Sequence, residues 1–236
     1  MKNVVQDLTS AGLDWAREKW KFGVGSKFIR QGEKNAVKYA DEIIVLSKGV
    51  QKYFMETYGR ETHFIPNGVN RPEVREARLI KDHFGLEKDS YILFLGRLVP
   101  EKGIRYLVEA FKNVRTDKKL VIAGGSSDTD SFMKESSIEN SPNSLGEAML
   151  LGVPCVASDV GGIADMLTHN DEGFLYPFDD SYKMAFYIRK TFLEIEDTKR
   201  RAECGRKHAA ITHDRKKNAE TLIEIYHKIC MNGSIC

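Results

Sequence analysis

The sequence of 236 residues lacks several patterns that would define its class at once. It has no run of about 18 or more apolar residues, the length that a helix needs to cross a membrane, so we expect no transmembrane helix. Its N-terminal stretch, MKNVVQDLTSAGLDW, has no apolar core of the signal-peptide kind, so we do not expect export and predict a cytoplasmic protein. The cysteines show no CxxC spacing and are expected to be reduced thiols; they are Cys155, Cys204, Cys230 and Cys236.

Motifs for other common functions are missing as well. No GxGxxG follows a β-like run, which argues against an NAD-dependent enzyme, and no GxxxxGK[ST] supports an ATPase. There is no supported DxD-type metal motif, and the 6 histidines are scattered without ligand spacing. A formal net charge of +2 is too small to indicate binding to nucleic acid. We therefore expect no metal site, no cofactor and no nucleic-acid partner.

The composition and the order of the segments are those of a soluble α/β protein. Hydrophobic residues make up 42% of the chain and charged residues 30%, which is ordinary for a globular protein. Helical segments alternate with short β-like runs, and this alternation is typical of a parallel sheet covered on both faces. The runs are DEIIVLS, THFIPNGV, YILFLG, KLVIAGG, PCVASD and GFLYP. The predicted fold is a Rossmann-like doubly wound α/β sheet, and a change of pattern after Pro72 divides the chain into residues 1–70 and 71–236.

Local signals predict where some helices begin and end. Ser47 is expected to cap an amphipathic helix that runs to Tyr58, because a serine hydroxyl accepts a hydrogen bond from the first turn. Gly85 is expected to end the helix REARLIKDHF, since glycine adopts the left-handed conformation that commonly follows a helix.

The loop after YILFL is the first strand exit that carries chemistry. Ligands of open parallel sheets bind at the carboxyl ends of the strands. Gly96 allows a sharp turn there, Arg97 lies at the exit, and Lys102 opens the next helix. A planar guanidinium beside an ammonium group suits a diphosphate. When this loop is considered alone, a solvated loop with surface charges is the alternative.

The second such exit leads into SIENSPNSLGEAMLLG, where two glutamates flank a helix start. We expect Pro142 in the first turn and Asn143 as the cap, with the N–H groups of Asn143 and Ser144 facing the ligand. Glu139 lies in the loop before the helix, and Glu147 lies inside it. Carboxylates accept hydrogen bonds from hydroxyls, so this pair beside an anion site predicts a polyhydroxylated phosphate ester. Capping or a surface charge is the alternative for either glutamate alone.

Together the two exits carry a family resemblance. GRLVPEKG followed by SSIENSPNSLGEAMLLGVPCVASDVGG resembles the GT-B glycosyltransferases of family 4, whose signature is E-x7-E within a pattern like EGxPNxxxEAMxxGxPVVxSxxGG. The resemblance covers nearly the whole chain, including HFIPNGV and the helical C-terminal tail, and the opening segment is similar to bacterial members that build cell-surface polysaccharides. It implies that residues 71–236 are the C-terminal, donor-binding half of a GT-B fold, and that residues 1–70 are a remnant of the acceptor domain.

The resemblance also implies an activity and the roles of particular residues. The protein would be a retaining, metal-independent glycosyltransferase that takes a UDP-, GDP- or dTDP-sugar and passes the sugar to a saccharide or lipid-linked acceptor. The catalytic residues implied are Glu139, which contacts the transferred sugar, and Arg97 and Lys102, which hold the diphosphate. Glu147 would bind the ribose hydroxyls. The full set of donor-binding residues implied is Gly96, Arg97, Lys102, Asn143, Ser144, Leu145 and Glu147.

The chain departs from the family pattern in several places. Of the N-terminal domain only the last portion, up to about Val69, is present. Ala11 stands where similar members have a histidine near the donor sugar, and alanine cannot move a proton. Only Ser126–Ser136 separates VIAGG from SIENS, where the family inserts a strand–helix–strand–helix region. Either YILFLG pairs directly with PCVASD in a reduced sheet of order 2-1-5-6, or residues are missing from the numbered chain.

These departures keep a second function open. The chain is either an active transferase or a catalytically inactive, truncated homologue that binds a nucleotide sugar or a partner. The opening segment, residues 15–38, mixes basic residues with Trp15, Trp20 and Phe28. It either contacts the anionic inner face of the membrane or packs between domains.

Overall fold

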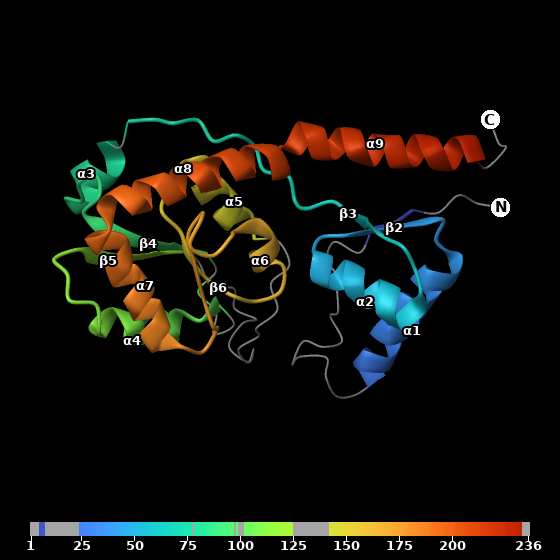
Figure 1. The fold of residues 1–236 in the computed structure, drawn as a ribbon, viewed down its shortest axis with the longest axis horizontal. Coiled ribbons are helices and arrows are strands. Elements are labelled where there is room, and N and C mark those ends of the chain that lie inside the picture. The colour runs from blue at the N-terminus through green and yellow to red at the C-terminus, as the bar shows by residue number, and fades with distance from the viewer. Residues whose placement is uncertain are drawn as a thin grey trace.

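The computed structural model describes residues 5–7, 24–76, 78–96, 98, 102–124 and 142–232. They form two units, which lie along the long axis of the molecule in Figure 1. The elements of the N-terminal unit are β1 (Val5–Asp7), α1 (Val24–Tyr39), β2 (Glu42–Val45), α2 (Lys48–Tyr58) and β3 (His63–Phe64). Those of the C-terminal unit are α3 (Arg78–Phe84), β4 (Tyr91–Leu95), α4 (Ile104–Lys112), β5 (Lys119–Ala123), α5 (Asn143–Leu150), β6 (Val156–Ser158), α6 (Ile163–Met166), β7 (Phe174–Tyr176), α7 (Ser181–Leu193) and α8 (Ile195–Thr212). They are followed by α9 (Arg215–Asn232).

The N-terminal unit is a parallel sheet of order β1-β2-β3 with α1 and α2 on one face. Side chains alternate along β2, so Ile43 and Val45 join the cluster formed with α1 and α2, whereas Ile44 points to the other face. The predicted cap of α2 is confirmed, because Ser47 Oγ accepts the Val50 N–H at 3.3 Å and the helix ends at Tyr58.

Helix α9 closes the other face of this sheet. Ile225 and Ile229 are buried against Ile44, with Ile65 and Leu222 packed beside them. Figure 1 shows α9 extending from the end of α8 in the C-terminal unit along the sheet of the N-terminal unit. The last helix therefore belongs to the core of the first strands.

The C-terminal unit contains parallel strand pairs covered by helices, and the α/β class is confirmed. β4 pairs with β5 from Tyr91↔Lys119 to Leu95↔Ala123, and β6 pairs with β7. The helix REARLIKDHF ends as predicted, with Gly85 in the left-handed conformation at φ 61°. On one side, Ile92 of β4 packs into a cluster formed by α4 and α7; on the other, Leu93 and Leu95 are 50% and 56% exposed. The β4–β5 pair is thus covered mainly on one face.

Direct pairing of YILFLG with PCVASD, expected for a reduced 2-1-5-6 sheet, is not what the described residues show. β4 is hydrogen-bonded to β5 and β6 to β7, as two separate pairs. Helices α4 and α7 share one buried cluster, in which Ala110 and Val114 lie with Met184 and Ile188. Ile92 of β4 and Val156 of β6 both pack against this cluster, so within the described residues it connects the two strand pairs.

Candidate functional site

The first turn of α5 is built so that its polar residues face outward. Pro142 is the cap position, with φ −71° and ψ 117°, and Asn143 is the first helical residue. The sequence had predicted Asn143 as the cap and Pro142 within the helix, which is wrong by one position. The extended backbone of Pro142 suits a cap, and its carbonyl accepts the N–H groups of Leu145 and Gly146 at 3.1 and 3.4 Å.

This arrangement leaves the start of α5 suited to an anion. The N–H groups of Asn143 and Ser144 precede the first intrahelical bonds, and both residues are exposed, as is Glu147. Leu145 points the other way and packs with Met149 and Leu167 in the core. Three of the four residues on this helix that were predicted to bind the sugar donor are therefore exposed, and the fourth, Leu145, packs against the core.

The exit of β4 is held tightly against the exit of β5. Gly96 donates its N–H to the carbonyl of Ala123 at 3.1 Å. A Cβ at Gly124 would lie 1.7 Å from the carbonyl oxygen of Gly96, so only glycine fits there. Lys102 is half-buried in the turn before α4, and Gly103 caps that helix at φ 66°. Two predicted residues of this exit, Gly96 and Lys102, are thus located.

Two of the predicted catalytic residues, Arg97 and Glu139, lie outside the described residues, as does Ala11. The convergence of Arg97 and Lys102 on the start of α5 consequently stays a prediction. The aromatic residues of the segment 15–38 are also outside the described side chains.

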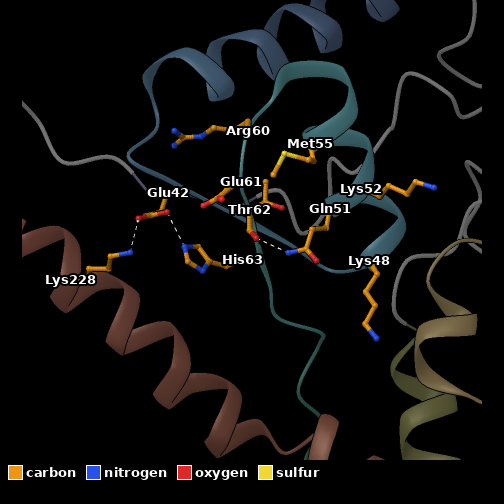
Figure 2. A pocket seen from close by; sticks show the side chains of 10 residues that line it. All are labelled: Glu42, Lys48, Gln51, Lys52, Met55, Arg60, Glu61, Thr62, His63 and Lys228. Carbon is orange, nitrogen blue, oxygen red and sulfur yellow. Dashed lines mark hydrogen bonds and ion pairs between the residues drawn. The ribbon is translucent and has the colours of Figure 1, made fainter.

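A separate pocket, which sequence reasoning missed, opens in the N-terminal unit (Figure 2). Its volume is about 570 Å³, and it lies between α2, the start of β3 and α9. The Glu42 carboxylate lies within hydrogen-bond distance of His63 Nε2, at 2.8 Å, and forms an ion pair with Lys228 at 3.8 Å. The lining residues are Glu42, Lys48, Gln51, Lys52, Met55, Arg60, Glu61, Thr62, His63 and Lys228.

The sequence held one signal for this pocket, a polar residue at the first position of each of two neighbouring parallel strands. These residues are Glu42 on β2 and His63 on β3. Several side chains that line the pocket already have hydrogen-bond partners within the protein. Gln51 donates to the Thr62 carbonyl at 2.7 Å, and the Arg60 guanidinium donates to the carbonyls of Ala40 and Asp41 at 2.8 and 2.7 Å. Charges of both signs line it, unlike the cationic surface predicted for a diphosphate.

Burial argues against Cys155 as an activated thiol. Burial raises the pKa of the Cys155 thiol to about 12, so the thiolate that a nucleophile requires is scarce at neutral pH.

Across the described residues, no group of three or more His, Cys, Asp or Glu side chains is arranged to hold a metal ion. In the same part of the chain, none of the helices combines the length and the apolar composition needed to span a bilayer.

Sequence comparison matches two overlapping profiles to this chain, both described as "Glycosyl transferases group 1". They cover residues 76–141 and 128–192, and so include both strand exits. Within residues 76–192, this chain carries the sequence of a group 1 glycosyltransferase. A further profile, a domain of unknown function (DUF1972), matches residues 7–70 of this glycosyltransferase.

Curated relatives agree with this family. The glycosyltransferase is 24% identical to alpha-maltose-1-phosphate synthase of Mycolicibacterium smegmatis, over 94% of this chain and 72% of the relative. It is 25% identical to phosphatidyl-myo-inositol mannosyltransferase of Mycobacterium leprae, over 81% of this chain and 60% of the relative. The chain thus spans part of each relative.

Solved structures show the same fold. Sucrose-phosphate synthase from Thermosynechococcus elongatus superposes with a TM-score of 0.80 at 20% identity, over 97% of this chain and 68% of that one. Anabaena Alr3699/HepE in complex with UDP-glucose superposes with a TM-score of 0.76 at 19% identity, over 94% and 72%. The Rossmann-like half of a GT-B fold is confirmed.

The alignment with the maltose-1-phosphate synthase also contains gaps in this chain. It extends over 282 positions but contains 94% of the 236 residues of this chain, or about 222 residues. About 60 aligned positions therefore have no residue here. The two family profiles overlap at residues 128–141, a range that includes most of the short Ser126–Ser136 link.

Proposed function

We propose that this glycosyltransferase binds the diphosphate of a nucleotide sugar between the exit of β4 and the first turn of α5. The single observation that carries the proposal is the outward-facing start of α5, where Asn143 and Ser144 are exposed and their N–H groups precede the intrahelical bonds. The solved complex of Alr3699/HepE with UDP-glucose, which shares the fold, supports a donor of this class.

The proposed mechanism follows from the charge that develops on the leaving group. When the glycosidic bond to the diphosphate breaks, negative charge grows on the leaving oxygen, and fixed donors stabilise it. Arg97, Lys102 and the start of α5 supply those donors without a metal. Glu147 accepts hydrogen bonds from the ribose hydroxyls, and Glu139 contacts the sugar, which is transferred with retention of configuration.

The proposed acceptor is a saccharide or a lipid-linked saccharide in the assembly of a cell-surface polysaccharide. The name of the Mycobacterium leprae relative, phosphatidyl-myo-inositol mannosyltransferase, includes a lipid acceptor. That name supports a lipid-linked acceptor for this chain. We place the transferase at the inner face of the membrane, with contact through residues 15–38. Flotation with anionic and neutral liposomes at low salt tests that contact, and failure to float with either kind contradicts it.

Calorimetry with UDP, GDP and dTDP, followed by transfer assays with the matching sugar nucleotides, tests the donor site. Arg97→Ala and Lys102→Ala are each expected to lower turnover by roughly a hundredfold or more, since one preorganised donor is worth about 3–4 kcal/mol. Lys112→Ala, at the far end of α4 from Lys102, is the matched control and should behave as wild type. Added EDTA should leave turnover unchanged. Full turnover in both Arg97→Ala and Lys102→Ala would remove the assignment.

A non-catalytic binding module is the second candidate function. The observation that favours it is that about 60 aligned positions of the relative have no residue here, together with the separate β4–β5 and β6–β7 pairs. Nucleotide-sugar binding without transfer or hydrolysis of the donor would decide for this module, whereas measurable turnover would exclude it.

A further inference from the structure

His213 lies where distant parts of the chain meet. It follows the end of α8, and its imidazole is 1% exposed. A Cβ built on Gly146, in the first turns of α5, would come within 3.1 Å of the His213 ring and 3.5 Å of a Val69 methyl group. The ring therefore packs directly under the start of α5, and Gly146 is the residue that permits this approach.

The hydrogen bonds around His213 determine its tautomer. Thr212 Oγ1 donates its only proton to the carbonyl of His208 at 3.0 Å. The 2.7 Å contact between His213 Nδ1 and Thr212 Oγ1 must then be an N–H donated by the imidazole. Nδ1 carries the proton, and Nε2 is a bare lone pair, buried without a partner among the described residues. The ring is thus held in one orientation by Thr212 and by packing.

The backbone of His213 also ties down the segment that joins the two units. The Val69 N–H donates to the His213 carbonyl at 2.9 Å, and Val69 is itself buried. Asn218, in α9, donates to the Pro66 carbonyl at 2.8 Å. His213 thereby contacts the linker through its backbone carbonyl and α5 through its imidazole ring.

We propose that His213 is a positioning residue for the nucleotide site, which sets the position of the first turn of α5 without touching the ligand. The inference rests on the proposed function, because it assumes that the N–H groups of Asn143 and Ser144 receive the diphosphate. Displacing a binding group by a fraction of an ångström weakens hydrogen bonds that depend on fixed geometry. A change at His213 should therefore reach the ligand through α5.

Four variants test the proposal: His213→Ala, His213→Asn, Gly146→Ala and the double variant His213→Ala/Gly146→Ala. Asparagine reproduces both ring contacts, because its amide N–H overlays Nδ1–H and its oxygen overlays the Cδ2 position next to Gly146. The dissociation constant of UDP, GDP or dTDP, whichever binds wild type, is measured well below the unfolding midpoint of each variant. Under that condition a loss of stability alone leaves the dissociation constant unchanged.

We expect His213→Ala and Gly146→Ala each to weaken nucleotide binding about tenfold, and His213→Asn to stay within about threefold of wild type. The double variant should bind no more weakly than the poorer single variant, since removing the ring makes room for the added methyl group. If His213→Ala does not fold, Gly146→Ala and His213→Asn still decide the question.

Binding by His213→Ala and Gly146→Ala within about twofold of wild type, or losses that multiply in the double variant, would overturn the positioning role alone. Absence of nucleotide binding by the wild-type chain would overturn both this role and the proposed function.

Discussion

The backbone N–H of Lys48 donates to Asp165 Oδ2 at 2.8 Å, and this hydrogen bond joins the first turn of α2 to α6. A carboxylate at the start of a helix is favourable both as a hydrogen-bond acceptor and as a negative charge near the positive end of the helix dipole. Here the carboxylate comes from the opposite unit, so a helix cap also fixes the contact between the units.

Asp165→Ala should therefore lower the free energy of unfolding by about 1 kcal/mol, the usual effect of losing a helix cap. Urea unfolding measures it, with Asp171→Ala as the control, because Asp171 is an exposed turn residue. An equal loss in both variants would show that the bond to Lys48 contributes nothing specific.

Gly68→Ala should destabilise the junction of the units by at least 2 kcal/mol, as expected when a core is overpacked against backbone. The added Cβ would lie 2.6 Å from the Cα of Arg215, which cannot move aside as a flexible side chain could. Gly49→Ala in α2, where the nearest atom is 4.0 Å away, should instead stabilise by about 0.5–1 kcal/mol. The same sign for both variants in chemical denaturation would refute the steric explanation.

Tyr58 is expected to make stability fall at alkaline pH. Its hydroxyl donates to the buried Glu33 carboxylate at 2.5 Å, and burial, together with this bond, raises the pKa of Tyr58 above its usual 10.0. The unfolded chain loses this proton first, so the stabilisation is complete below pH 10 and declines as pH rises further. Thermal melts between pH 8 and pH 11 should show a shallower decline for Tyr58→Phe, whereas Tyr39→Phe, at a residue 63% exposed, should follow wild type.

His213 is expected to have the opposite pH dependence. Burial, and secondarily His208, lowers the pKa of His213 below its usual 6.5. As pH falls through 6.5 the unfolded chain takes up a proton before the native chain, so native stability declines below that pH. The difference in unfolding free energy between pH 7.5 and pH 5 should be smaller for His213→Asn than for wild type. Equal differences would mean that the buried imidazole is not the group that titrates.

Glu147→Gln should weaken binding of the nucleotide sugar about tenfold and leave kcat nearly unchanged. A carboxylate bound to ribose hydroxyls contributes charge-assisted hydrogen bonds in both the ground state and the transition state, and uniform binding of this kind appears in KM. Steady-state kinetics with the donor identified by calorimetry measure the effect, and Glu220→Gln on α9 serves as the exposed control. A fall in kcat at constant KM would instead assign Glu147 to the chemical step.

Features set by a few neighbouring residues were predictable from the sequence. The cap at Ser47, the end of the α3 helix at Gly85 and the strand YILFL all lie where local rules put them. The predicted start of α5 was wrong by one residue. Proline and asparagine both favour the first positions of a helix, and only the backbone conformation shows which of them is the cap.

Placements that depend on distant segments were not predictable. Nothing near Ile44 indicates that Ile225 covers it, and nothing near His213 indicates that it packs under Gly146. The pairing of Glu42 with His63 required knowledge of which strands are neighbours. The separate pairing of β4 with β5 and of β6 with β7 likewise depends on contacts between distant segments, which no single stretch of sequence encodes.

The packing of α9 against β2 has a consequence for how the protein is made. During synthesis, Ile44 emerges from the ribosome long before Ile225 and Ile229 are translated, so the face of β2 that carries Ile44 stays exposed to water during that interval. Contacts so distant in sequence form slowly, and the nascent chain needs protection from association throughout that interval. The order of translation therefore leaves this face of β2 without its covering helix while the intervening residues are made.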